Sequence, residues 1–138
     1  MTGLQIPESF PLSALVGQQI TQVCIGVGQV QLHFYKLTAG SPPQRWEPGA
    51  RIDIEAGFEL AMPGADVLIV QNEEISMHGG LLSGLLNDNV SSVSRLAQNE
   101  LALSFSSDAK LRLLTDAQGF ESYHLHVEGE SVDVTRPG

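Results

Sequence analysis

His124 and His126 are the residues whose type and spacing point most directly to metal chemistry. They alternate with Tyr123, Leu125 and Val127, and this alternation predicts a strand that turns its apolar side chains inward and both imidazoles outward. Two imidazoles on one strand face could share a zinc ion. By sequence, however, no cysteine lies nearby, and only distant carboxylates are available as further ligands. We therefore predict exposed histidines, with no metal and no cofactor.

Other combinations of catalytic residue types are weaker. Glu73 and Glu74 are adjacent carboxylates, but their polar surroundings offer no burial that would raise a pKa. His33 is predicted to point outward from a strand, and His78 falls in a predicted linker. The sequence contains no Gly-x-Ser-x-Gly elbow, phosphate-binding loop, dinucleotide fingerprint or HExxH helix. We predict no catalytic residues and a protein that is not an enzyme.

Trp46, the only tryptophan of the chain, is flanked by Arg45 and Glu47 in a segment of residues 35–50 that has no equally long counterpart elsewhere in the sequence. Tryptophan and arginine are enriched at the energetic centres of protein interfaces. Two interpretations stay open. The indole is either an anchor for a partner or a lid that folds back over the sheet.

The elements that must position these side chains follow from an internal repeat between residues 15–34 and 85–105. Apolar residues recur at a constant offset, and again after one inserted residue: Leu15, Ile20 and Val23 match Leu85, Val90 and Val93, while Val30, Leu32 and Phe34 match Leu101, Leu103 and Phe105. A fixed self-similarity indicates a duplicated supersecondary unit. We predict one domain over residues 1–138, with repeats at 8–70 and 79–135 and a linker at 71–78.

Each unit is predicted to be one short helix followed by about five strands. Ser9 can cap the first helix, with Pro11 in its first turn and Gly17 closing it in the left-handed region. Asn87 stands where Gly17 stands, and asparagine also tolerates that conformation. Alternating apolar residues predict half-buried antiparallel strands that would expose edges if each unit stood alone. The expected fold is mostly β with a minor α contribution, either one barrel-like closed sheet or two packed antiparallel sheets, flanked by two short helices.

The formal net charge of -9 at pH 7 restricts the partners. Nucleic acids and anionic membranes would repel such a chain, whereas a cationic protein would be attracted. Carboxylates on the predicted late strands lack enough neighbouring bases to pair them all, and would form a steering field: Asp53, Glu55, Glu59, Glu128, Glu130 and Asp133. With Arg45, Trp46 and Glu47, these are the predicted partner-binding residues.

The N-terminal residues and the cysteine content favour a cytoplasmic protein. Residues 1–12 have no basic region followed by an apolar run, and no stretch approaches the roughly 18 to 20 apolar residues of a membrane span. Cys24 is the only cysteine and lies in an apolar row, which predicts a small buried hydrophobic residue in a reducing compartment.

The sequence Phe120-Glu-Ser-Tyr123, followed by a glycine-containing turn and a strand at residues 132–134, resembles the C-terminal region of a group of small uncharacterised bacterial proteins. Their strands open with a Leu-x-Gly-x-x-Val pattern similar to that from Leu15 to Ile20. The chain has Phe120 and Tyr123 where that group more often shows tyrosine and tryptophan. The resemblance implies a mostly β fold, no assigned enzymatic activity and kinship with acidic immunity-type proteins that neutralise bacterial toxins.

Two functions are compatible with these features. The first is a non-catalytic module, an immunity-type inhibitor that covers a basic partner such as a bacterial toxin domain. The second is a small-molecule-binding or enzymatic β-barrel module. It would need polar groups pointing into the barrel, whereas the alternation places nearly all of them outside.

Overall fold

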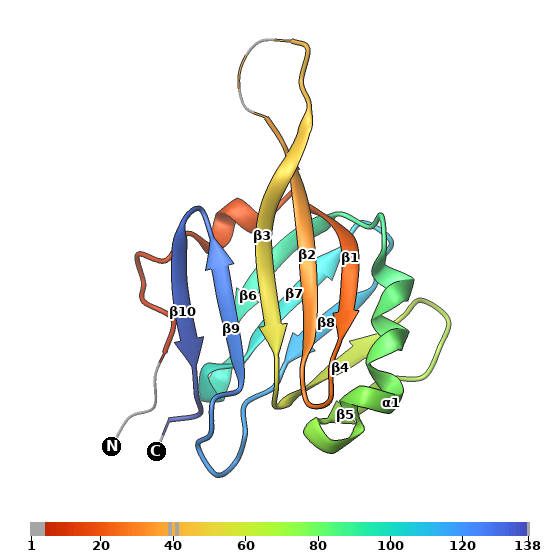
Figure 1. Ribbon diagram of the computed structural model, residues 1–138, viewed down its shortest axis with the longest axis vertical. Helices are drawn as coiled ribbons and strands as arrows, with labels where there is room; N and C mark the ends of the chain where they lie inside the picture. Colours follow the sequence, from red (N-terminus) through yellow and green to blue (C-terminus); the bar gives the residue numbers. More distant parts are fainter. Residues whose placement is uncertain (1–4, 39, 41, 138) are drawn as a thin grey trace.

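The computed structural model describes residues 5–38, 40 and 42–137 as two stacked antiparallel sheets of five strands each (Figure 1). Sheet A has the order β1-β2-β3-β9-β10 and sheet B the order β5-β4-β8-β7-β6. The strands of sheet A are β1 (Gln19–Ile25), β2 (Val30–Leu37), β3 (Trp46–Ile54), β9 (Tyr123–Val127) and β10 (Glu130–Val134). Those of sheet B are β4 (Gly57–Ala61), β5 (Leu68–Gln71), β6 (Val90–Arg95), β7 (Leu101–Phe105) and β8 (Lys110–Leu113).

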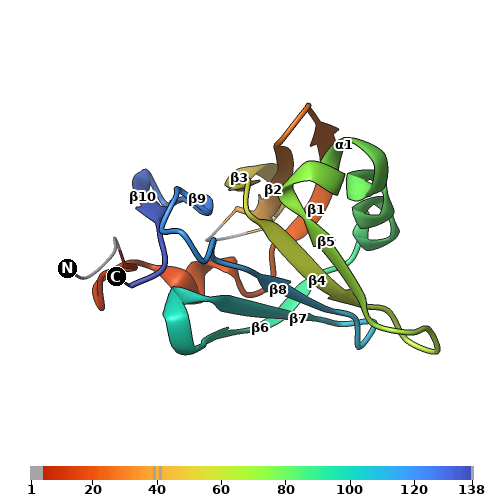
Figure 2. The ribbon, with the colours of Figure 1, turned by 90° about the horizontal axis from the view of Figure 1, so that it is seen from below.

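Each sheet combines three strands from one half of the chain with a hairpin from the other half. The chain crosses from sheet A to sheet B after β3, and returns after β8 (Figure 2). When β1 to β5 are matched in order with β6 to β10, the two sheets have the same strand order. The β9–β10 hairpin pairs with β3, and the β4–β5 hairpin pairs with β8, so neither β3 nor β8 is left as an open edge. This shared connectivity is what a duplication would produce, and the duplication itself stays a prediction.

The two sheets enclose one apolar core. Phe34 and Phe105 both belong to it, which confirms that the halves share a core. The predicted inward positions of β2 and β7 are buried and alternate with partly exposed ones. Of the two predicted arrangements, the structure has the packed antiparallel sheets.

The starts of β1 and β6 meet through reciprocal backbone hydrogen bonds. Gly17 N donates to Val90 O at 2.8 Å, and Asn87 N donates to Ile20 O at the same distance. Both donors have left-handed backbones, with φ of 88° at Gly17 and 67° at Asn87. The predicted left-handed conformation of both residues is therefore confirmed.

Short helical segments flank the sheets, and two of them, at residues 12–15 and 79–85, lie where the sequence predicts helices. The 3-10 segments are η1 (Leu12–Leu15), η2 (Asn72–Glu74), η3 (Gly79–Leu85) and η4 (Ala97–Asn99), and the α-helical turn is α1 (Ile75–His78). The predicted cap at Ser9 is wrong, because η1 begins only after Pro11 and has no side-chain cap. The predicted linker 71–78 is largely helical, since Ile75 is buried in the core. No helix in the described part of the chain is long and apolar enough to cross a membrane.

The β2–β3 hairpin extends beyond the rest of sheet A (Figure 1). Half of the segment at residues 35–50 is strand, because β2 continues to Leu37 and β3 begins at Trp46. Thr38 N donates to Arg45 O at 2.7 Å and prolongs the pairing by one step. The hairpin thus projects from the sheet instead of folding back over it.

Candidate functional site

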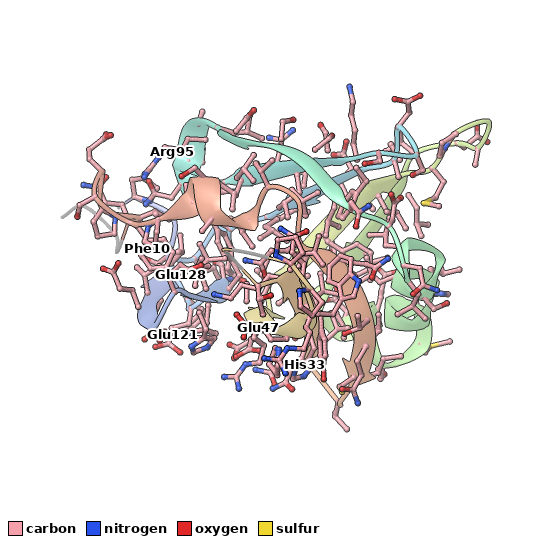
Figure 3. The ribbon with its side chains drawn as sticks, turned by 90° about the horizontal axis from the view of Figure 1, so that it is seen from above. Phe10, His33, Glu47, Arg95, Glu121 and Glu128 are labelled. Carbon is pink, nitrogen blue, oxygen red and sulfur yellow. The ribbon has the colours of Figure 1, made fainter. Side chains whose placement is uncertain are left out.

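The outer face of sheet A carries a dense set of titratable side chains in two cross-strand rows. One row contains Gln31, Asp53, His124 and Asp133, and the next contains His33, Arg51, His126 and Ser131. Glu55, just after β3, and Glu121, just before β9, lie beside the first row, next to His124. We call these ten residues the histidine face. In Figure 3, Glu121 and His33 lie on the side of the molecule opposite Arg95 of sheet B.

Asp53 and Arg51 form the central ion pair of this face. Arg51 Nε lies 3.0 Å from Asp53 Oδ1, and Nη2 lies 3.2 Å from Oδ2. Arg51 Nη2 also donates to His126 Nε2 at 3.0 Å, and His126 Nδ1 is then free to donate to Ser131 Oγ at 2.9 Å. The Asp53 side chain is only 8% exposed although it points outward. Both nitrogens of His126 are therefore occupied by neighbours on its own sheet.

His124 has a different set of partners. Its Nδ1 hydrogen-bonds the Asp133 carboxylate, while its Nε2 lies 3.2 Å from Glu55 Oε1 and 3.8 Å from Glu121 Oε2. Burial lowers the pKa of His124, but the hydrogen bonds and negative charges of Asp133 and Glu55 outweigh it and raise the pKa above its ordinary value. This environment stabilises positive charge at the imidazole.

An open pocket of about 310 Å³ begins at this cluster. It is lined by Glu55, Ala56, Asn72, Glu73, Asp116, Phe120 and Glu121. Four of these side chains are carboxylates, and no lysine or arginine is among the described residues that line the pocket. The expectation that only distant carboxylates surround His124 is therefore wrong. Pairing of β9 with β3 brings Glu55 close, and Glu121 precedes His124 by three residues.

The projecting hairpin is the second candidate region. Leu37 and Trp46 are cross-strand neighbours, and Tyr35 lies two residues before Leu37 on the same face of β2. These three side chains, which we call the hairpin stripe, are 47%, 45% and 38% exposed in that order. The stripe is an apolar surface in contact with water, and Trp46 lies outside the core.

The other face of the hairpin is charged. Lys36 and Glu47 are cross-strand neighbours there, and Lys36 Nζ lies 3.2 Å from Glu128 Oε1 on the β9–β10 turn. A hollow of about 440 Å³ lies at the base of this face, lined by Ala14, Val16, Gly17, Gln18, Lys36, Leu37, Glu47 and Glu128. Glu47 and Glu128, which line this hollow, are labelled in Figure 3.

The structure distributes the predicted partner-binding residues over three regions. Arg45, Trp46 and Glu47 lie on the hairpin or at its turn, with Glu128 and Glu130 nearby on the β9–β10 turn and β10, and Asp53, Glu55 and Asp133 lie on the histidine face. Glu59 lies instead on the outer face of sheet B, beside Ile69 and Arg112, because β4 belongs to that sheet.

The sequence predicts too few neighbouring bases to pair all of these acids, and four of them do have a basic partner. Asp53 pairs with Arg51, Glu128 pairs with Lys36, and both Glu55 and Asp133 lie against His124. Glu47, Glu59 and Glu130 form no ion pair with another described residue.

Glu100, which the sequence analysis did not single out, is a buried carboxylate at the far end of sheet B. Arg112 Nε donates to Glu100 Oε1 at 2.8 Å, and Thr115 N donates to Oε2 at 3.3 Å. Nearby, the Tyr123 hydroxyl donates to Asn99 O at 2.5 Å. Burial, together with the charge of Glu100, raises the pKa of Tyr123 well above its usual value. These contacts tie the C-terminal strands to sheet B and are structural.

Comparisons with protein-family models, with curated proteins and with solved structures gave no match to this chain.

Proposed function

We propose that the protein is a non-catalytic binding module that covers a basic protein partner, and that it acts as an immunity-type inhibitor of a bacterial toxin domain in the cytoplasm. The observation that carries the proposal is the hairpin stripe of Tyr35, Leu37 and Trp46, which projects from sheet A and remains exposed. A tryptophan on a projecting element can enter a partner's pocket and become desolvated there.

Charge near the hairpin supports a cationic partner. The chain has a formal net charge of -9, and Glu47 and Glu130 form no ion pair with another described residue. Carboxylates at the rim of an apolar contact accelerate the encounter with a basic surface, while the apolar contact slows dissociation. The immunity role depends on the sequence resemblance and is the more specific part of the proposal.

The sandwich interior gives less support to a small-molecule module. The described core is made of tightly buried apolar side chains, including Phe34, Phe58 and Phe105. Four pockets of the described residues open to the surface. One lies beside the hairpin, one beside the histidine face, one between Ile6 and Arg95, and one between Gln71 and Arg136.

Site-specific photo-crosslinking in the native cell tests the binding surface. A photoreactive residue would replace Trp46 in one variant and Ala102, on the outer face of sheet B, in a matched control. We expect one basic protein to be captured from position 46 and not from position 102. Equal capture from both positions, or capture of an acidic protein, would contradict the proposal.

Expression of the captured partner in a host cell then tests inhibition. The captured partner, expressed alone, should arrest growth of the host cell, and co-expression of the wild-type chain should restore growth. The Trp46→Ala variant should fold with an unchanged melting temperature and fail to restore growth. A partner that is harmless alone would refute the immunity role but leave the binding module standing.

A further inference from the structure

We propose that Glu55, Glu121 and His124 bind a divalent first-row transition-metal ion, with Zn²⁺ as the representative ion. The three side chains come from the end of β3, the segment before β9, and β9 itself. This site is separate from the hairpin stripe, and the proposal does not depend on the proposed binding function.

The geometry of the three ligand atoms suits a metal. One atom from each residue lies within 4.8 Å of the other two, and His124 Nε2 is 3.2 Å from Glu55 and 3.8 Å from Glu121. Zinc bonds of about 2.0–2.2 Å to nitrogen and oxygen in a tetrahedral site place ligands roughly 3.4 Å apart. Small side-chain rotations would therefore bring all three atoms into a coordination sphere.

Asp133 supplies the support that a metal-binding histidine needs. Its carboxylate accepts a hydrogen bond from His124 Nδ1, which fixes the ring orientation and leaves Nε2 directed at Glu55 and Glu121. Carboxylate–histidine–metal arrangements of this kind orient the ring and make its ligating nitrogen more basic. The cluster thus contains an oriented imidazole, and it is more than a group of exposed acids.

The pocket beside the cluster favours a cation and leaves room for further ligands. Glu73 and Asp116 line it together with Glu55 and Glu121, and its described lining contains no lysine or arginine. Three protein ligands beside an open pocket leave a coordination position for water or another small ligand, as in catalytic zinc sites. The imidazole ligand favours zinc, copper, nickel or iron over Mg²⁺ and Ca²⁺.

The neighbouring histidine provides a natural contrast. His126 lies two residues away on the same strand, but Arg51 donates to its Nε2 and Ser131 accepts from its Nδ1. The guanidinium occupies the lone pair of Nε2 and its charge opposes a metal cation, while the carboxylate oxygen 3.3 Å from Nε2, Asp53 Oδ2, is already paired with Arg51. The two histidines of β9, which the sequence analysis considered as a pair, therefore have different roles.

Calorimetric titration of tag-free, chelator-treated protein with ZnCl₂ tests the site. We expect one ion per chain and a higher melting temperature with Zn²⁺, and no comparable effect of MgCl₂ or CaCl₂. His124→Gln, Glu55→Gln and Glu121→Gln should each weaken binding at least tenfold. Asp133→Asn should weaken it by about 10- to 100-fold, the range found for outer-shell partners.

His126→Gln is the matched control, and its Kd should stay within about twofold of the wild-type value. Glu121→Gln distinguishes the loss of a metal ligand from misfolding. This side chain is 57% exposed, so its replacement should not change the melting temperature of the metal-free protein. No zinc binding by the wild-type chain would overturn the proposal. Full zinc binding by Glu121→Gln, or loss of binding in His126→Gln, would overturn the assignment of the ligands.

Discussion

The two sheets present the same inner surface but different outer surfaces. On β3 and the matching strand β8, the inward residues are Ile52 and Ile54 in one case and Leu111 and Leu113 in the other, and all four are fully buried. Packing against a shared core restricts both strands to aliphatic side chains of similar size. The residues of the inner faces are therefore determined by the packing of the core.

The outward positions of β9 and its counterpart β4 differ in chemistry. β9 carries His124 and His126, whose neighbours on β3 are Asp53 and Arg51. β4 carries Glu59, which has Arg112 on one side and the apolar Ile69 on the other. Further across sheet B, the outward positions of β6 and β7 are small: Ser92, Ser94, Ala102 and Ser104.

This contrast shows where the fold leaves the sequence free to vary. Nothing in the packing of the sandwich requires a histidine-rich set of ion pairs on one outer face and mainly small residues, with the Arg112–Glu100 pair, on the other. The histidines, the carboxylates that contact them and the exposed tryptophan lie on sheet A, where both proposals place their sites, and sheet B supplies several of the controls.

The largest effect is expected at the shared inner positions. Leu32→Ala in β2 and Leu103→Ala in β7 each remove a fully buried side chain, and each should lower the free energy of unfolding by about 2–5 kcal/mol. Urea denaturation measures both, with Ser104→Ala on the outer face as control. If one of the two substitutions lowered the free energy of unfolding by less than 1 kcal/mol, the two halves would not contribute equally to one core.

Trp46→Ala should act on binding and leave folding unchanged. Because the indole lies outside the core, its loss should leave the melting temperature the same but weaken partner binding by on the order of 2 kcal/mol through faster dissociation. Surface plasmon resonance with the captured partner separates the rates. Val27→Ala, which removes another exposed apolar side chain, should leave both rates unchanged. A lower melting temperature with intact binding would show that Trp46 is structural.

Asp53→Asn and Glu59→Gln compare the outward carboxylates of the two sheets. Asp53 pairs with Arg51 and is largely covered, so its neutralisation should lower the free energy of unfolding by roughly 1 to 2 kcal/mol. Glu59 forms no ion pair with another described residue, so Glu59→Gln should change stability by less than about 0.5 kcal/mol. Equal losses of unfolding free energy in denaturant melts would show that the Asp53–Arg51 pair does not stabilise the outer face of sheet A.

Local sequence patterns predicted local structure well. The alternation around Leu32 and Leu103 correctly predicts the inward faces, and the left-handed positions Gly17 and Asn87 follow from residues that tolerate a positive φ. Each of these features depends on a few consecutive residues. The predicted burial of Cys24 is only partly met, because it is half-buried and lies opposite Gln31 on the outer face.

The candidate metal cluster could not be predicted in the same way. Its ligands Glu55 and His124 are 69 positions apart, and they meet because the second half returns a hairpin to the first sheet. The repeat indicated two similar units without indicating which strands would pair between them. One local signal was present, since Glu121 and His124 are three residues apart, but no sequence pattern placed Glu55 beside them.

Tyr123→Phe compares the inner residue at the start of β9 with Phe58, its counterpart on β4. Burial, with the charge of Glu100, raises the pKa of Tyr123 above its ordinary value of 10.0, so the fold favours the neutral phenol. The stability that the folded chain gains from keeping Tyr123 neutral is complete below pH 10. It is lost as the pH rises above that value. At pH 8 the variant should be less stable by about 1 kcal/mol through the lost hydrogen bond.

Melting temperatures of both proteins between pH 8 and 11 test this expectation. The gap between wild type and Tyr123→Phe should narrow above pH 10, because only the wild type has a buried phenol to ionise. A gap that stays constant across this range would show that the Tyr123 hydroxyl ionises as easily in the folded as in the unfolded chain.

The smallest effect is expected from single charge reversals. It distinguishes attraction of the partner by carboxylates near the hairpin from attraction by the net charge of the whole chain. Glu47→Lys on the hairpin and Glu59→Lys on sheet B change the net charge of the chain equally. Neither residue gives up an ion pair with another described residue.

If the partner docks on the hairpin, Glu47→Lys should slow association a few-fold and reduce its salt dependence, because a rim charge acts mainly on the encounter rate. Glu59→Lys should change association much less. Equal slowing by both reversals would mean that the partner responds to the net charge of the whole chain, and the hairpin would then supply only the apolar contact.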